Sequence, residues 1–254
     1  MSFAVTSDHI DQFNRDGFLK LSGFLSAEDL EELNQRIDVV IRTVVPGLPS
    51  EDVFYEIRGK VDTLKQIQRV WHHDAWIAQH FLEGAFKEWA QALLGGEVIP
   101  KNLQYFNKPP GLGRATPAHQ DGYYFMLNPC EAVTLWLALD DVDEENGCVR
   151  YIPGSHGEGM RPHNRTNTLG FSQGIRDYPT PDDQDREVAM PAHPGDLLVH
   201  HAMTIHRADG NRSVKRSRRS LGFIYYSERT RQDEAAHRAY QEKLKKEMTD
   251  AGKI

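Results

Sequence analysis

The pattern of apolar residues changes at Glu97, and this change limits the fold more than any other feature of the 254-residue chain. Earlier apolar side chains recur mainly at helical spacing, whereas later ones form short or alternating runs separated by Pro, Gly and Asp. Many short strands with helices on either side predict a sandwich, jelly roll or barrel. The runs predict strands over 98–107, 117–125, 132–140, 149–152, 187–192, 196–200, 204–207 and 219–226.

The helices can be placed by the same periodicity. Apolar spacing and end signals predict helices over 7–16, 26–44, about 75–94 and 229–249, with a brief strand over 17–21. A chain of this length that is rich in strands is expected to form one domain. We expect residues 1–254 to comprise a mostly helical support (1–96), a β core (97–228) and a C-terminal helix (229–254).

Residues 154–186 interrupt the predicted strands with a polar stretch that is rich in Gly and Pro and has no clear periodicity. A structureless connection of this length inside a compact domain is usually functional or disordered. Because this one lies between strands, we expect a lid loop over the functional site.

Composition and charge exclude several classes of protein. No apolar run approaches the roughly 18 to 20 residues of a membrane span, and the N-terminus lacks a basic segment followed by an apolar one. The sequence therefore predicts a soluble, cytoplasmic protein with no membrane partner. A net charge of -7 argues against a nucleic-acid binder. Two cysteines, Cys130 and Cys148, are too few for a Cys-rich metal site.

The segment His119-Gln120-Asp121 is the first candidate for chemistry, between a Pro/Gly loop and an aromatic run. On an extended strand, residues i and i+2 project from the same face about 6.6 Å apart. The imidazole and the carboxylate can then converge on one cation. A metal site still requires a third ligand.

Three downstream histidines are candidates for that ligand: His200, His201 and His206. Any of them would complete a set of two imidazoles and one carboxylate, which is typical of non-haem Fe(II) oxygenases. The same set fits a Zn(II) hydrolase that uses a metal-bound water. A non-catalytic protein that binds a small molecule on the same scaffold is a further interpretation.

Ordered motifs run along almost the whole chain. They are Asp16-Gly17-Phe18-Leu19, Phe24-Leu25-Ser26, Phe106-Asn107-Lys108-Pro109-Pro110, His119-Gln120-Asp121, the run 133–141, the run 144–156 and Pro194-Gly195-Asp196. Together they resemble the phytanoyl-CoA dioxygenase (PhyH-like) family of Fe(II)/2-oxoglutarate-dependent oxygenases. The resemblance implies a mainly β fold with flanking helices around a double-stranded β-helix (jelly-roll, cupin-like) core.

The resemblance also implies the iron ligands and the reaction. It assigns iron to His119, Asp121 and His206, and it chooses His206 because Asn211 follows five residues later. The implied reactants are 2-oxoglutarate, O2 and a small organic molecule whose unactivated C–H bond becomes hydroxylated, with release of succinate and CO2. Asp121 favours hydroxylation, because related halogenases have a small residue at that position.

The co-substrate pocket follows from the same resemblance. Arg218 is expected to pair with the distal carboxylate of 2-oxoglutarate, because a planar guanidinium can bind a carboxylate through two parallel hydrogen bonds. The preceding turn is one residue longer than usual in the family, so Arg216 and Arg219 stay as alternatives. Ala208 stands where the family often has Ser. The other implied contacts are Gln120, Trp136, Asn102 and Gln104, with Thr134 in place of that Ser.

The substrate itself is less defined. An acyl-CoA would require a basic mouth for its phosphates, and Arg161, Arg165 and Arg176 of the lid are diluted by acidic neighbours. We therefore expect a small polar molecule or a natural product. The side chains expected to form a wall of its binding site are Tyr123, Tyr124 and Phe125.

Overall fold

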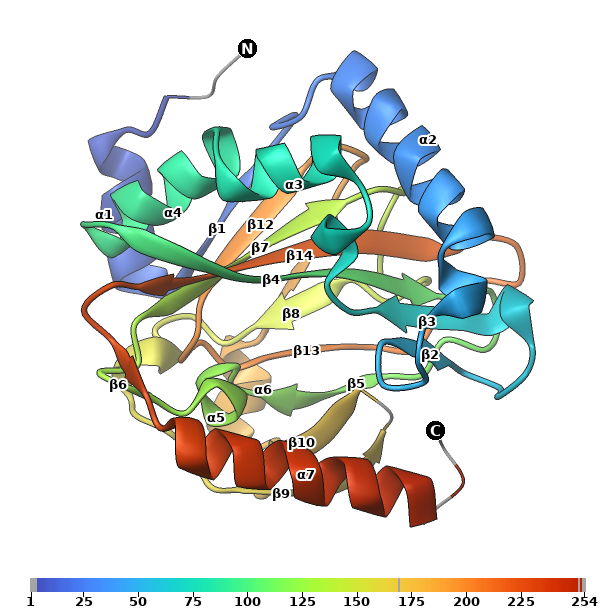
Figure 1. The fold of residues 1–254 in the computed structure, drawn as a ribbon. Helices are drawn as coiled ribbons and strands as arrows, with labels where there is room; N and C mark the ends of the chain where they lie inside the picture. Colours follow the sequence, from blue (N-terminus) through green and yellow to red (C-terminus); the bar gives the residue numbers. More distant parts are fainter. Residues whose placement is uncertain (1–3, 169, 251, 253–254) are drawn as a thin grey trace.

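The computed structural model describes residues 4–168, 170–250 and 252, and within them two antiparallel sheets face each other (Figure 1). The larger sheet has the order β1 (Phe18–Leu21), β12 (Leu197–His201), β7 (Ala132–Ala138), β14 (Arg218–Ser227), β4 (Val98–Lys108), β3 (Leu64–Ile67) and β2 (Val53–Tyr55). The smaller sheet has the order β11 (Val188–Met190), β8 (Val149–Tyr151), β13 (His206–Ala208) and β5 (Thr116–His119). This pair of sheets is the predicted jelly roll.

Alternation along the strands decides which side chains face the helices and which face the second sheet. On β7, Leu135 and Leu137 belong to the core beneath the helices, whereas Trp136 and Ala138 pack with side chains of β8. Thr134 points to the same side as Trp136 and lines a cavity. The functional site therefore lies between the two sheets.

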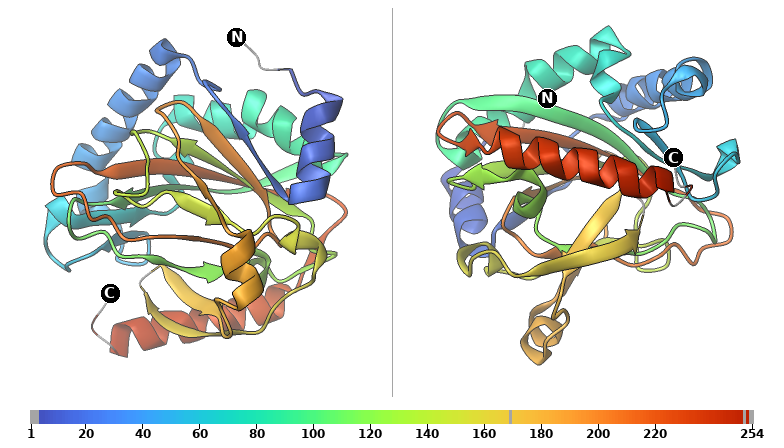
Figure 2. Two further views of the ribbon diagram at one scale, coloured as in Figure 1. Left: turned by 180° about the vertical axis from the view of Figure 1, so that it is seen from behind. Right: turned by 60° about the horizontal axis from the view of Figure 1, so that its bottom comes forward.

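The helices of the first third of the chain cover the outer face of the larger sheet (Figures 1 and 2). They are α1 (Ser7–Asp16), α2 (Ala27–Thr43), α3 (Ala75–Leu82) and α4 (Ala85–Leu94), with 3-10 turns η1 (Val45–Gly47), η2 (Val61–Thr63) and η3 (Val70–His72). Their buried side chains, among them Ile37, Phe81 and Trp89, pack on the apolar face of that sheet. No helix in the described part of the chain is long and apolar enough to cross a membrane.

Two predicted elements are divided in the structure, and two strands of the larger sheet were not predicted. The helix expected over 75–94 is interrupted at Gly84, whose φ of 86° is a conformation that favours glycine. The strand expected over 117–125 ends at His119 and is followed by a short helix, α5 (Gly122–Phe125). The strands β2 and β3 extend the larger sheet beyond β4 and help to wall the cavity.

Residues 154–186 are not the structureless loop that the sequence predicted. They contain η4 (Ser155–Gly157), a hairpin of β9 (His163–Thr168) and β10 (Phe171–Ile175), and helix α6 (Pro181–Arg186). The polar composition hid these elements because ion pairs and backbone pairing, rather than an apolar face, hold them in place. A further ribbon joins β6 (Leu127–Asn128) to β15 (Arg231–Gln232).

The C-terminal helix, α7 (Glu234–Asp250), is confirmed and lies along the hairpin of β9 and β10 (Figure 2). Arg165 of β9 forms an ion pair with Glu247 at 2.6 Å, and Ser172 Oγ lies 2.5 Å from the Tyr240 hydroxyl. Side chains of α7 and of the hairpin line the same cavity. Together the two elements cover one side of the space between the sheets.

Candidate metal centre and its cavity

Three side chains from two segments of the chain converge beside the smaller sheet. His119 ends β5, His206 begins β13, and these two residues are paired across the strands. Asp121 follows β5 in a helical conformation, with φ of −56° and ψ of −35°. One ligand atom from each residue lies within 4.8 Å of the other two. The predicted ligands are therefore brought together, although a turn rather than the expected extended strand brings Asp121 there.

Backbone carbonyls orient both imidazoles. His119 Nδ1 lies 2.8 Å from the carbonyl oxygen of Pro117, and His206 Nδ1 lies 3.0 Å from that of Thr204. Because each Nδ1–H donates to a carbonyl, Nε2 carries the free lone pair, as in many metal-binding histidines. These Nε2 atoms lie 3.4 and 3.7 Å from Asp121 Oδ1.

The second carboxylate oxygen of Asp121 is held by the larger sheet. Thr134 Oγ1 donates to Oδ2 at 2.7 Å, and His200 Nε2 lies 3.3 Å from the same oxygen. His200 Nδ1 in turn lies 3.0 Å from the buried Tyr151 hydroxyl. His200, one of the histidines left open as a third ligand, thus stands behind the carboxylate. Oδ1 is left to face the two imidazoles of the metal group.

Burial and neighbouring groups set the protonation of this cluster. Burial alone would raise the pKa of Asp121, but the imidazoles of His206, His119 and His200 hold that pKa well below its ordinary value. Burial lowers the pKa of His206 well below its ordinary value, and the two neighbouring imidazoles lower it further. A carboxylate and neutral imidazole nitrogens therefore share a buried site. This set of donors fits a divalent transition metal.

A cavity of about 740 Å³ is lined both by these ligands and by Arg218, the first residue of β14. Arg218 is 4% exposed, and its buried Nε has no hydrogen-bond partner. Its Nη1 donates to Ser220 Oγ at 3.3 Å, and its guanidinium lies 5.3 Å from the centre of the Trp136 ring. Burial lowers the pKa of Arg218 to about 10, so the side chain is still charged near neutral pH. No carboxylate of the described residues pairs with this cation, which is the environment that an anionic ligand requires.

The two alternative arginines lie elsewhere. Arg216 forms ion pairs with Asp143 and Glu145 at 2.7 and 2.6 Å, and Arg219 pairs with Asp140 at 2.8 Å. Neither lines the cavity. Of the three, Arg218 is the one in a position to meet a ligand between the sheets.

Comparison with known proteins agrees with this geometry. The family model of phytanoyl-CoA dioxygenase (PhyH) matches residues 13–220. The chain belongs to this family. The PhyH-family chain is 25% identical to the peroxisomal phytanoyl-CoA dioxygenase of Bos taurus over 214 residues, covering 79% of this chain and 63% of that relative. It is 28% identical to phytanoyl-CoA dioxygenase domain-containing protein 1 of Bos taurus over 265 residues, covering 86% and 89%. The chain thus spans less than two thirds of the peroxisomal relative's length.

Solved structures share the fold of this PhyH-family chain. The non-heme alpha ketoglutarate dependent carbocyclase SnoK from nogalamycin biosynthesis matches with a TM-score of 0.72 at 22% identity, covering 93% of this chain and 90% of its own. EctD from S. alaskensis, crystallised with 2-oxoglutarate and 5-hydroxyectoine, matches with 0.73 at 19%, covering 88% and 76%. EvdO2 from Micromonospora carbonacea var. aurantiaca matches with 0.70 at 26%, covering 89% and 93%. The predicted jelly-roll core is therefore confirmed.

Most of the residues that the sequence assigned to the co-substrate line the cavity of the PhyH-family protein, but Gln120 does not. Gln120 is fully buried, and its Nε2 donates to the carbonyl oxygens of Gly159 and Met203 at 2.9 and 2.8 Å. Its Oε1 accepts from the backbone N–H of Arg161 at 2.8 Å. The carboxamide is occupied in holding the start of the lid segment. The residues that do line the cavity are Trp136, Thr134, Asn102 and Gln104.

The expected aromatic wall is divided. Tyr124 and Phe125 line the cavity, and the Tyr124 ring stands edge-on to His119 with 5.8 Å between centres. Tyr123 instead stacks on His163 at 4.3 Å and is not part of the lining. Successive side chains on a helix diverge by about 100°. The short helix α5 therefore cannot present all three rings to one space.

Two buried lysines of the cavity were missed by the sequence analysis. Lys108 is 4% exposed and donates to the carbonyl oxygens of Arg114 and Asp209 at 2.8 and 2.6 Å. Lys65 of β3 forms a buried ion pair with Glu56 at 3.2 Å. Lys108 lies within a family-like motif, which was a usable signal. Lys65 lies in a strand that the sequence did not predict, so nothing pointed to it.

Proposed function

We propose that this PhyH-family protein is an Fe(II)- and 2-oxoglutarate-dependent dioxygenase. In the proposed reaction, a C–H bond of a small organic molecule, 2-oxoglutarate and O2 give the hydroxylated product, succinate and CO2. The observation that carries the proposal is one cavity lined by both the group His119, Asp121 and His206 and the buried Arg218.

The metal would be held by His119, Asp121 and His206. Bound iron would supply the redox chemistry that couples oxidation of the 2-oxo acid to C–H hydroxylation. The protein orients the two imidazoles through carbonyl groups and holds the carboxylate through Thr134 and His200. Ligands fixed in this way do not need to rearrange when the metal binds.

Arg218 would bind the distal carboxylate of 2-oxoglutarate. A bidentate hydrogen-bonded pair would supply the counter-ion that this buried guanidinium lacks. Contact with the face of Trp136 restricts where the guanidinium can lie. We therefore expect the site to prefer a 2-oxo acid with a second carboxylate over one without.

The remaining walls would exclude water from the reacting C–H bond. Tyr124 and Phe125 supply apolar surface beside the ligands, and α7 with the hairpin of β9 and β10 covers the cavity. Exclusion of water is needed because it protects the reactive species until the substrate is in place.

The alternatives that share these ligands account for less of the structure. A Zn(II) hydrolase would use the same two imidazoles and carboxylate with a bound water, but it gives no role to a buried cation such as Arg218. A non-catalytic binding protein gives no reason for the complete set of three ligands. The oxygenase explains both features.

Anaerobic titration tests the proposal directly. Fe(II) followed by 2-oxoglutarate should produce a metal-to-ligand absorption band in the wild-type protein and none in Asp121→Ala. Admission of O2 should then release succinate. Absence of the band from the wild type would defeat the oxygenase assignment, and a band without succinate on any substrate panel would favour the binding protein.

The location of the protein and the class of its partner belong to the same proposal. We propose a cytoplasmic enzyme that acts on a small molecule and not on a nucleic acid, which the net charge of -7 supports. The phytanoyl-CoA dioxygenases of Bos taurus and Homo sapiens are named as peroxisomal, whereas the domain-containing protein 1 of Bos taurus is not. Fractionation of cells that express the tagged chain tests the location.

A further inference from the structure

Strand β14 runs past the metal group, and its inward side chains reach both ends of the cavity. Arg218, Ile224 and Tyr226 are an even number of positions apart, so they share one face of the strand, and all three line the cavity. Ile224 is paired with Thr134, which donates to Asp121, so Ile224 is level with the metal group. Tyr226 therefore lies on the side of the metal group that is away from Arg218.

The Arg218 end of the cavity is the one suited to the co-substrate. Arg218 is paired with Lys108 across β14 and β4, and neither of these buried cations forms an ion pair with any residue that the structure describes. Trp136 and Gln104 are both paired with Gly222, and they line the stretch between Arg218 and the metal group. The space beyond the metal group is left for a second molecule.

Aromatic rings surround this second part of the cavity. Phe171 of β10 and Tyr124 of α5 both lie against His119, with 5.4 and 5.8 Å between ring centres. Phe125 packs on Tyr226 with 5.0 Å between centres. These four aromatic side chains all line the cavity. Because aromatic pairs attract each other through offset or edge contacts in addition to burial, such walls favour a ligand that is itself a ring.

Helix α7 closes the same space with one face. Met248 is buried, and the Tyr240 hydroxyl lies 2.5 Å from Ser172 Oγ of the hairpin. The partly or fully buried side chains of α7 that line the cavity recur at helical spacing, and they are His237, Tyr240, Leu244 and Met248. We refer to the space between these four side chains and the rings of Tyr124, Phe125, Phe171 and Tyr226 as the aromatic chamber.

Ion pairs hold α7 at both rims of the aromatic chamber. Glu247 pairs with Arg165 of the hairpin at 2.6 Å, and Lys245 pairs with Glu51, shortly before β2, at 2.9 Å. The helix lies across the sheets at this side of the molecule (Figure 2). Since its polar contacts are at the edges and its apolar side chains lie between them, α7 forms a wall of the chamber.

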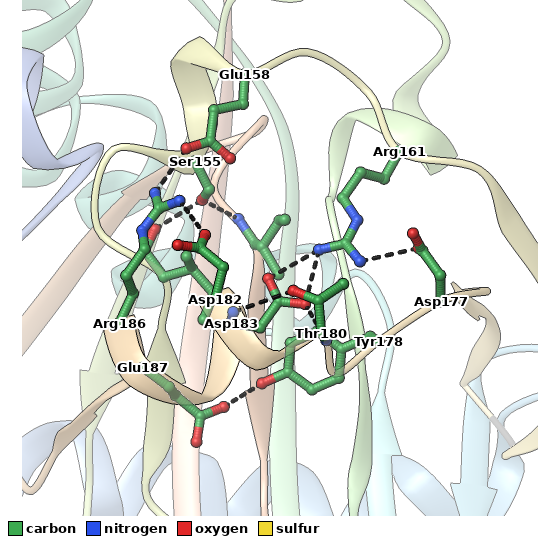
Figure 3. Close-up of polar contacts among 12 residues, drawn as sticks. Ser155, Glu158, Arg161, Asp177, Tyr178, Thr180, Asp182, Asp183, Arg186 and Glu187 are labelled. Carbon is green, nitrogen blue, oxygen red and sulfur yellow. Dashed lines mark hydrogen bonds and ion pairs between the residues drawn. The ribbon is translucent and has the colours of Figure 1, made fainter.

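The other part of the lid segment does not reach the chamber. Arg161 lies between Asp177 and Asp183, at 2.9 and 2.8 Å (Figure 3). Neither Arg161 nor Arg176 lines the cavity. Arg165 does line it, but its charge is already compensated by α7. None of the three lid arginines is therefore free to bind a phosphate group inside the chamber.

The polar groups that remain at the chamber are weakly charged or exposed. Lys101 lies over the Tyr226 ring at 5.1 Å and is exposed to solvent. His237 is partly buried, and its ring forms no hydrogen bond with any described residue. Burial lowers the pKa of His237, and the nearby Lys101 lowers it further, so the ring is neutral near pH 7. A neutral imidazole can bind a hydroxyl or a carbonyl oxygen.

We propose that the aromatic chamber is the substrate site and that it takes an uncharged molecule built on an aromatic or fused ring with few hydroxyl or carbonyl groups. This inference rests on the proposed function. Rings supply apolar contacts on several sides, and the described lining of the chamber has no buried, unpaired cation for an anionic group. The whole cavity, about 740 Å³, is large enough for such a molecule beside a co-substrate.

Two walls of the aromatic chamber lie outside the part of the chain that the family model matches. The match covers residues 13–220, whereas Tyr226 and α7 come later in the sequence. Membership of the family therefore does not determine the substrate of this chain. The chamber instead assigns that choice to residues such as Leu244, whose side chain faces the cavity from α7.

Calorimetric titration of the protein loaded with Fe(II) and 2-oxoglutarate, without O2, tests the chamber. The ring probes are coumarin, flavanone and testosterone. The comparison probes are methyl glucoside and myo-inositol, which are uncharged but polar, and octanoyl-CoA, which carries an acyl chain and phosphates. We expect at least one ring probe to bind at least about 10-fold more tightly than every comparison probe.

Two substitutions separate the chamber from the co-substrate site. Leu244→Trp fills the chamber and should weaken binding of the ring probe at least about 10-fold, while the affinity for 2-oxoglutarate changes by less than about 2-fold. Phe171→Leu stays apolar but removes one ring, and it should weaken binding of the ring probe about 5-fold, as expected for one aromatic pair. Ala239→Trp, at an exposed position of the same helix, is the matched control and should change neither affinity.

Three results would overturn the inference. They are the absence of a ring probe that binds more tightly than every comparison probe, wild-type binding of the ring probe by both Leu244→Trp and Phe171→Leu, and an equal loss of affinity for 2-oxoglutarate in Leu244→Trp. Thermal melting checks that each variant is folded, and Phe171→Leu decides if Leu244→Trp is not. Failure of the proposed function looks different, because the 2-oxoglutarate absorption band would be absent. The same titration on the protein alone then decides the chamber by the same ranking.

Discussion

The cavity has two polar regions, and they differ in charge and in whether their hydrogen-bonding groups have protein partners. Arg218 is a buried cation with no carboxylate beside it in the described part of the chain. Four neutral side chains of β3, β4 and the residue after β3, here called the amide wall, partly satisfy one another: Gln66, Gln68, Asn102 and Gln104. A ligand at Arg218 is selected by charge, and a ligand at the amide wall is selected by the arrangement of its donors and acceptors. The Arg218 end of the cavity therefore requires an anionic ligand, and the amide wall does not.

The proposed metal ligands line the cavity that contains both polar regions, so their removal should have the largest effect. Asp121→Ala should lower succinate release by at least about 1000-fold and abolish Fe(II) binding, while the protein stays folded because a buried charge is removed. Succinate assays, equilibrium dialysis with Fe(II) and thermal melting check this. His193→Ala, at a histidine whose side chain is 84% exposed, is the control. Full activity in Asp121→Ala would show that the metal lies elsewhere.

Removal of the Arg218 guanidinium should have the second-largest effect. Arg218→Ala is expected to raise the KM for 2-oxoglutarate about 100-fold, because a charge-assisted bidentate pair is lost. Arg216→Ala, which disturbs an exposed ion pair, should change that KM by less than about 3-fold. Initial rates over a range of 2-oxoglutarate concentrations measure both. The reverse ranking would mean that the strand register was misread.

Replacement of His200, which lies behind Asp121, should have a smaller effect. His200→Phe keeps the ring shape but removes the contact with Asp121 Oδ2, and it should weaken Fe(II) binding by about 10-fold. Tyr151→Phe removes only the hydroxyl that contacts His200 and should weaken it less. Competition dialysis of Fe(II) gives both affinities. Unchanged affinity in His200→Phe would show that Thr134 alone positions the carboxylate.

The smallest effect is expected outside both regions, at the ion pair between α7 and the hairpin. Glu247→Gln should lower the free energy of unfolding by no more than about 0.5 kcal/mol, because both side chains are about 40% exposed and solvent screens the pair. Urea unfolding measures the change. A loss above about 2 kcal/mol would show that the pair holds the whole helix in place.

Local sequence patterns were sufficient for the elements that have an apolar face or a specific motif. The first helix and most of the core strands after Glu97 were predicted because side-chain periodicity can be read from neighbouring residues. Spacing pointed to His119 and Asp121, whereas the family resemblance was needed to choose His206. The lid hairpin and β3 were missed, because their order depends on distant partners. Arg165, for example, is held by Glu247, more than eighty positions away in the chain.

The roles of individual polar residues also fall into two groups: those that the sequence indicated and those that only the folded structure decided. Sequence alone identified the family, the jelly roll and the three candidate metal ligands that the structure brings together, since these follow from ordered motifs and alternating strands. Tertiary structure separated Arg218 from Arg216 and Arg219 and placed His200 behind Asp121, because burial and pairing exist only in the folded chain. It also assembled the amide wall from β3 and β4, whose side chains meet through strand register. Sequence motifs determine which polar groups are present. Packing determines which of these groups lack a partner in the protein and can therefore bind a ligand.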